Sequence, residues 1–201
     1  FENKNSHLRN YEFNSPILEQ MMESERLDER SRGRPRLLLT QLLKQRPGTH
    51  GTNLHITTST SAKKALYDLK SDYILLMFQS IECDACKELT NAIDASEVVK
   101  TMKDMGKLTV LAIYPGPAIE DWKKYQADMP AWWTKGYDHD LEIEEQETYA
   151  LFNIPSLYLL DKNHMVIMKE TSLNYAEYYL ANMMNLPIAN VPVDTQQTAQ
   201  N

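Results

Sequence analysis

The two cysteines of this chain, Cys83 and Cys86, are the residues whose type and spacing could do chemistry. They lie three positions apart in the stretch MFQSIECDACKELTNAI, residues 77–93. At this spacing, one turn of helix brings both sulfur atoms into disulfide range. The pair could be a redox-active dithiol, half of a metal site, or two small apolar residues, and a Cys-x-x-Cys motif alone does not decide among these.

The composition narrows the alternatives. The 201 residues are 42% hydrophobic and 24% charged, which is typical of a globular chain long enough to bury a core. A formal net charge of -7 argues against a nucleic-acid partner, and no apolar run reaches the roughly 18 residues of a transmembrane segment. The chain begins at Phe1 without a basic and then apolar leader, so we expect a mature or truncated form.

We expect neither a metal site nor a cofactor. Two cysteines are too few for a structural zinc site, which usually takes four Cys or His ligands. The histidines lie far from the cysteines in the sequence and show no ligand spacing among themselves; they are His7, His50, His55, His139 and His164. A dithiol would carry electrons without any further group.

Residues 1–47 differ in character from the rest of the chain. They are highly charged, with apolar residues at helical spacing, and predict a helical N-terminal segment. Ser15 is a candidate N-cap, and Gly33 and Pro35 should end this first helix before a second one over 36–45. We expect a single domain over 48–190 and a flexible tail over 191–201.

The pattern of residues 53–114 places the cysteines at a junction. A β-hairpin over 53–69 precedes a continuous apolar run at 73–79, a helix ending at Gly106, and a second apolar run at 108–114. This order is a βαβ unit with parallel strands. Cys83 falls between the first strand and the helix, and Cys86 lies in the first helical turn, where unpaired backbone N–H groups favour a thiolate. Cys83, the more exposed, would attack a disulfide, and Cys86 would resolve the mixed disulfide.

The second half of the sequence continues the alternation. It predicts a helix from 119, an irregular aromatic stretch over 129–140, a helix over 141–152, strands over 156–161 and 164–170, and a helix from Asn174. We expect Asp138 or Asp140 to cap the helix that follows them. The aromatic side chains could form a lip beside the cysteines, although core packing is the favoured interpretation; they are Trp122, Trp132, Trp133 and Tyr137.

This arrangement resembles the thioredoxin fold, and specifically the TlpA-like envelope thiol–disulfide oxidoreductases. The likeness covers residues 48–186 and is carried by the dithiol junction and by NIPSLYLLDKNHMVIMKE, residues 153–170. Residues 114–140 look most like uncharacterised members from Gram-negative bacteria. The resemblance implies an α/β fold with a central mixed sheet, an N-terminal hairpin and a cis bond between Ile154 and Pro155. That proline would hold the substrate backbone beside Cys83 and block metal capture.

The sequence departs from the family pattern around the dithiol. Glu82 replaces the usual aromatic residue before the first cysteine, and Met77 stands where thioredoxins carry a buried carboxylate. Negative charge from Glu82, Asp84 and Glu88 should raise the pKa of the Cys83 thiol, while the helix terminus and Lys87 act in the opposite direction. If the acids dominate, the protein is a reductant rather than an oxidant.

The resemblance therefore implies a thiol–disulfide oxidoreductase of the periplasm or cell envelope of a Gram-negative bacterium. Its partners would be protein disulfide or dithiol substrates and an upstream redox partner protein. The alternative is a redox-inactive binding module with a structural or vestigial disulfide, an interpretation that Glu82 and the missing carboxylate motivate.

Overall fold

The computed structural model describes residues 14–145 and 148–187, so the expected tail over 191–201 lies outside the described residues. The helices are α1 (Ser15–Glu23), α2 (Glu29–Leu43), α3 (Asp84–Ala95), α4 (Glu97–Asp104), α5 (Ile119–Tyr125), α6 (Glu142–Glu145) and α7 (Leu173–Met184), with short 3-10 turns η2 (Leu66–Asp68) and η3 (Gln126–Asp128). The strands are β1 (His55–Thr57), β2 (Lys63–Ala65), β3 (Tyr73–Phe78), β4 (Leu108–Tyr114), β5 (Thr134–Tyr137), β6 (Ser156–Asp161) and β7 (Val166–Met168).

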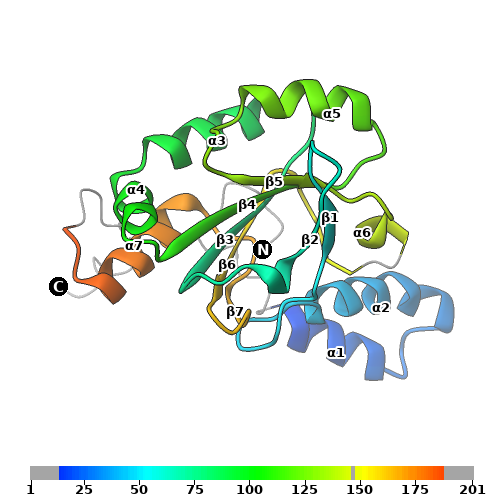
Figure 1. The fold of residues 1–201 in the computed structure, drawn as a ribbon. Helices are drawn as coiled ribbons and strands as arrows, with labels where there is room; N and C mark the ends of the chain where they lie inside the picture. The colour runs from blue at the N-terminus through cyan, green and yellow to red at the C-terminus, as the bar shows by residue number, and fades with distance from the viewer. Residues whose placement is uncertain (1–13, 146–147, 188–201) are drawn as a thin grey trace.

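The seven strands form one mixed sheet in the order β2-β1-β5-β4-β3-β6-β7 (Figure 1). The central strand pair, β3 with β4, is parallel, as expected for the strand–helix–strand unit that carries the cysteines. Strand β6 runs antiparallel to β3 on the other side. The α/β class, the mixed central sheet and the β1–β2 hairpin predicted from the sequence are confirmed.

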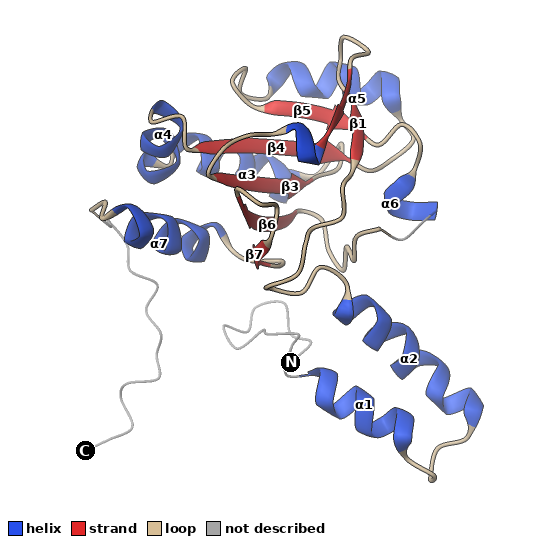
Figure 2. Cartoon of the chain, turned by 60° about the horizontal axis from the view of Figure 1, so that its bottom comes forward, coloured by secondary structure: helices blue, strands red, loops and turns tan. Residues whose placement is uncertain are grey.

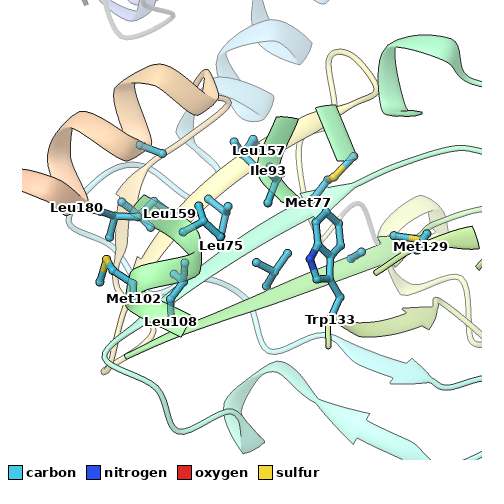
Figure 3. Packing of buried hydrophobic residues seen from close by; sticks show 14 of the residues in the cluster. Leu75, Met77, Ile93, Met102, Leu108, Met129, Trp133, Leu157, Leu159 and Leu180 are labelled. Atoms are coloured by element: carbon cyan, nitrogen blue, oxygen red, sulfur yellow. The ribbon is translucent and has the colours of Figure 1, made fainter. Parts of the chain in front are cut away.

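Two apolar layers enclose the sheet. Alternate side chains of β3 and β4 point to opposite faces, which is why both strands read as continuous apolar runs. One face packs against α3, α4 and α7, and the labelled side chains of Figure 3 converge there. The other face packs against η2, α6 and Tyr149. Because both faces are covered, the two strands are held rigidly and fix the position of whatever follows them.

Both outer edges of the sheet are short and protected. Strand β2 has three residues, and two of them are exposed lysines, Lys63 and Lys64. Strand β7 also has three residues, and its outer edge bonds to the segment that leaves α2: the Gly48 N–H donates to the Val166 carbonyl, and the Val166 N–H donates to the Thr49 carbonyl, both at 2.8 Å.

The N-terminal segment forms a helical hairpin in which α1 and α2 pack side by side (Figure 2). The prediction that Gly33 and Pro35 end a helix is wrong, because α2 continues through both. Proline inside a helix costs about 3 kcal/mol. Asp28 offsets part of this cost as N-cap, accepting the Ser31 N–H at 2.7 Å, and Pro35 is buried. The predicted N-cap was also one residue late, since Asn14 precedes α1.

The sequence missed one strand. Residues 134–137 lie in the stretch predicted to be irregular, yet they form β5, parallel to β4 and antiparallel to β1. Gly136 explains the weak strand signal, since glycine is disfavoured in strands. A Cβ at this position would lie 2.8 Å from the Ile56 Cβ, so the close approach of β1 and β5 requires a glycine there.

Several predicted boundaries also moved. Ser96 divides the expected long helix into α3 and α4 by accepting the Val99 N–H at 3.1 Å. Among the described residues α6 covers Glu142–Glu145, and α7 begins at Leu173, with Ser172 as its N-cap, rather than at Asn174. In the turn between β6 and β7, His164 has the left-handed conformation, with φ of 61°.

Candidate functional site

Cys83 and Cys86 form a disulfide at the junction of β3 and α3. Cys83 is the N-cap of α3, and its Sγ accepts the backbone N–H of Cys86 at 3.1 Å. The Cys83 carbonyl accepts the N–H groups of Cys86 and Lys87, each at 3.1 Å. The sulfur therefore sits at the positive end of the helix dipole with an N–H pointing at it, and this geometry stabilises a thiolate after reduction.

The two sulfur-bearing residues differ sharply in exposure. Cys86 has no accessible surface and packs in the core cluster under α3, whereas Cys83 is partly exposed. Met77, at the position where thioredoxins carry a carboxylate, is also fully buried in this cluster. Water and a protein partner can therefore reach Cys83 but not Cys86.

The register of the sheet brings Ile154 and Pro155 to the same edge as the cysteines. Phe78, the last residue of β3, pairs with Ser156, the first residue of β6. One step further along this register, Pro155 lies opposite Gln79, four residues before Cys83. The Ile154–Pro155 peptide bond is cis, as the resemblance implies.

The three charged residues expected to tune the thiol surround Cys83 in the sequence and are exposed. Glu82 immediately precedes it in the left-handed conformation, with φ of 57°. The Asp84 Oδ1 lies 3.6 Å from the Lys87 Nζ, and the Asp84 side chain is 93% accessible. Because water and salt screen exposed charges, each of these groups can shift the reactivity of the thiol only modestly.

Gln79 is a buried polar residue that the sequence analysis overlooked. Its side chain is inaccessible, and its Nε2 lies 3.0 Å from the Met129 Sδ. Its Oε1 has no hydrogen-bond partner among the described residues. The sequence signal was a polar side chain, Gln79, directly after the apolar run that forms β3. Gln79 places a polar group beneath the loop that leads to the cysteines.

A pocket of about 660 Å³ opens beside the site and was not predicted. It lies between the N-terminal hairpin and the sheet, and it combines residues from five parts of the chain. These are α2, the loop after β3, the end of β4 with the loop after it, α6, and the segment before Pro155. The lining residues are, in that order, Leu37, Leu38 and Gln41; Ser80; Tyr114 to Gly116; Ile143 and Glu144; and Tyr149, Leu151, Phe152 and Ile154. The signal in the sequence was a run of three leucines, residues 37–39, inside a highly charged segment.

Specific polar contacts fasten the hairpin to the sheet. The Lys169 Nζ, just after β7, donates to the carbonyls of Gln41 and Leu42, each at 3.1 Å, and to that of Lys44. These groups lie at the carboxyl end of α2, where carbonyls lack helical partners and a cation is favoured. The buried Gln45 Nε2 donates to the Thr52 Oγ1 at 2.9 Å and to the Thr148 carbonyl. The wall of the pocket is thus fixed in place.

The remaining candidates have structural roles. Trp122, Trp133 and Tyr137 are buried, so the core interpretation is confirmed for them, and the Trp132 Nε1 donates to the Asp94 Oδ1 at 2.9 Å. Asp138 caps α6 by accepting two backbone N–H groups, and burial raises the pKa of its carboxyl against the lowering effect of these bonds. Within residues 14–145 and 148–187, no group of three His, Cys, Asp or Glu side chains could hold a metal ion, and no helix is both long and apolar enough to cross a membrane.

Comparison with solved structures gives clear relatives. A thioredoxin-like protein from Bacteroides caccae is 36% identical over 89% of this chain, with a TM-score of 0.86. The chain belongs to the thioredoxin-like proteins. The match spans 64% of the length of the Bacteroides caccae protein.

Two further solved structures are similar to this chain. The C-terminal domain of an uncharacterised protein from Bacteroides fragilis is 39% identical over 68% of this chain and 98% of that domain, with a TM-score of 0.67. The thioredoxin domain of a thiol–disulfide oxidoreductase from Bacteroides vulgatus shares the fold, with a TM-score of 0.58 at 20% identity over 71% of this chain and 99% of that one. No family model and no curated protein matches the sequence.

Proposed function

We propose that this protein is a thiol–disulfide oxidoreductase that exchanges the Cys83–Cys86 pair with protein substrates. One observation carries the proposal: the partly exposed Cys83 sulfur caps α3 and is bonded to a fully buried partner. A purely structural disulfide needs neither the helix terminus nor this asymmetry, whereas an exchange reaction uses both.

The reaction runs in two displacements. In the reduced protein, the Cys83 thiolate attacks one sulfur of a substrate disulfide, forms a mixed disulfide and releases the other substrate sulfur as a thiolate. The Cys86 thiolate then attacks the Cys83 sulfur, closes the Cys83–Cys86 bond and releases the second substrate thiolate. Two electrons pass to the substrate, whose thiolates take up two protons. The exchange requires no cofactor, because the cysteine pair itself is oxidised.

Ile154 and Pro155 would hold the substrate backbone beside Cys83. Their place opposite the end of β3 supports this role, because a segment lying along residue 154 passes the loop that carries the attacking sulfur. Acidic groups near Cys83, namely Glu82 and Asp84, support operation as a reductant, since like charge disfavours the thiolate. An upstream redox partner protein would then return the pair to its reduced state.

The resemblance to envelope oxidoreductases supports a location in the periplasm or cell envelope of a Gram-negative bacterium. Fractionation of the source cells, followed by detection of the chain with an antibody, tests this location. Recovery in the cytosolic fraction would contradict it.

Equilibration in glutathione and dithiothreitol buffers tests the function. Free thiols trapped with a mass tag should show a midpoint between about -120 and -270 mV, the range of known exchange enzymes, and toward its negative end for a reductant. A value near about -120 mV would contradict the reductant direction alone. A pair that stays oxidised well below about -300 mV would contradict the function and favour a binding module with a structural disulfide.

A further inference from the structure

The pocket between the N-terminal hairpin and the sheet borders the two segments that flank the disulfide site. Ser80 lines it three residues before Cys83, and Ile154, whose bond to Pro155 is cis, lines it from the segment before β6. Three residues of extended chain span at most about 11 Å. An extended segment docked with its cysteine at Cys83 therefore brings a side chain within three residues of that cysteine to the pocket.

The lining determines which side chains fit. Apolar atoms of Leu37, Leu151, Phe152 and Ile154 form much of it, and Glu144 contributes a carboxylate. Two of these apolar side chains remain open to water, because Leu37 is 56% exposed and Ile154 is 37% exposed. Covering them with another apolar group removes their surface from water, which is favourable, whereas a charged group would lose its hydration there.

The wall contributed by α2 is held rigidly enough to select a partner. Lys169 and Gln45 fasten the carboxyl end of the helix to the sheet, as described above. The match to the Bacteroides caccae protein covers more of the chain than residues 48–201 could supply, so the likeness extends into the N-terminal segment. A shape that is fixed before binding loses little conformational freedom when a ligand docks.

We propose that this pocket binds a bulky apolar side chain located within three residues of the reactive cysteine of the protein substrate, and that Leu37 of α2 is a specificity-determining residue. The N-terminal hairpin is then part of the substrate-binding surface rather than an appendage. This inference rests on the proposed function, because it assigns a substrate preference to the same disulfide site.

A peptide exchange assay tests the pocket. Each peptide carries one cysteine activated as a mixed disulfide with thionitrobenzoate; six place Phe one, two or three residues before or after the cysteine, and a seventh has Ser at all these positions. The full chain bearing Cys86→Ala attacks the peptide sulfur through Cys83, forms the protein–peptide disulfide and releases coloured thionitrobenzoate. No net oxidation occurs, because one disulfide replaces another.

The expected result is a rate for at least one Phe peptide about tenfold above that of the Ser peptide, which corresponds to partial burial of the ring. Adding Leu37→Gln should reduce this ratio about threefold. Leu43→Gln is the matched control, because Leu43 is exposed on the same helix at 44% but does not line the pocket. It should leave the ratio unchanged.

Each other outcome has a definite meaning. If all peptides react at the same rate, or if both leucine variants lower the ratio equally, the pocket proposal is wrong while exchange at Cys83 stands. If no peptide reacts, the proposed function itself fails. If the unaltered chain is a dimer that Leu37→Gln dissociates, a second copy occupies the pocket, and the proposal is overturned.

Discussion

At the scale of single residues, the two cysteines differ in solvent exposure. Cys83 is partly exposed and Cys86 is inaccessible, although their Cα atoms are only 5.2 Å apart. An incoming disulfide can meet only the first sulfur. Under the proposed function, the second sulfur would react only with Cys83, as a resolving cysteine does.

Single-cysteine variants should separate these two roles. Cys86→Ala retains the attacking thiol and should accumulate a mixed disulfide with a protein substrate, because nothing resolves it. Cys83→Ala should form at least tenfold less of this species, since its remaining thiol is buried. Non-reducing electrophoresis and mass spectrometry measure both. Equal trapping by the two variants would contradict the assignment.

The charges beside Cys83 should tune its reactivity in opposite directions. Glu82→Gln removes a negative charge and should lower the pKa of the reduced Cys83 thiol, so alkylation by iodoacetamide near neutral pH should accelerate about twofold. Lys87→Gln removes a positive charge and should slow it by a similar factor. Alkylation rates across a pH series measure both effects, which high salt should diminish. Shifts of the same sign in both variants would exclude an electrostatic cause.

At the scale of elements, Gly136 allows β5 to approach β1 closely. Gly136→Ala should destabilise the protein by about 1–3 kcal/mol, because the new Cβ would meet Ile56 on β1 and overpack the contact. Gly33→Ala is the matched comparison: it lies within α2 with open space around it and should stabilise that helix by up to about 1 kcal/mol. Urea unfolding followed by circular dichroism measures both. A neutral Gly136→Ala would refute the close packing of β1 against β5.

The start of α6 should depend on pH through Asp138. Burial raises the pKa of this carboxyl above its usual value of 3.8. At pH values between 3.8, the pKa in the unfolded chain, and the raised pKa of the folded protein, the folded state holds more protons than the unfolded state. The free energy of unfolding therefore falls as the pH rises through that window. Asp138→Asn lacks this dependence. The stability of the unaltered protein relative to the variant should therefore decline from pH 3.5 toward neutrality, as urea titrations at several pH values would measure; an increase would reverse the sign we assign.

The elements that sequence could predict are those with strong local signals. Strands β3, β4 and β6 are continuous apolar runs, and the cysteine spacing marked the junction between β3 and α3. Strand β5 escaped prediction because Lys135 and Gly136 carry little strand propensity, and pairing on both sides determines its conformation. Burial of Pro35 in the helical hairpin likewise overrode its local preference. The pocket could not be predicted from the run of leucines at 37–39 alone, because the opposite wall comes from residues 143–154, more than a hundred positions later in the chain.

At the scale of the whole molecule, hydrogen bonds from Lys169 and Gln45 join the hairpin to the rest of the fold. We propose that residues 48–187 fold around the sheet and that residues 14–47 dock onto it. Lys169 contributes to this docking because its charged amine satisfies carbonyls at the end of α2.

Removing this link should loosen the hairpin and leave the sheet intact. Lys169→Met should weaken the attachment by about 1.5–3 kcal/mol, the value of hydrogen bonds to a charged group. Amide hydrogen exchange in residues 29–43 should accelerate, while that in β3 and β4 should not change. Lys162→Met, on the exposed turn between β6 and β7, is the control. Equal exchange in both variants would show that apolar contacts alone hold the hairpin.

The two protected edges of the sheet limit its pairing with other chains. Exposed strands with free backbone groups invite other chains to pair with them and begin aggregates. Here one border is a three-residue strand carrying two lysines, and the other is already occupied by residues 48 and 49. Neither border therefore offers a long row of free backbone groups along which an extended segment of another chain could add as a further strand.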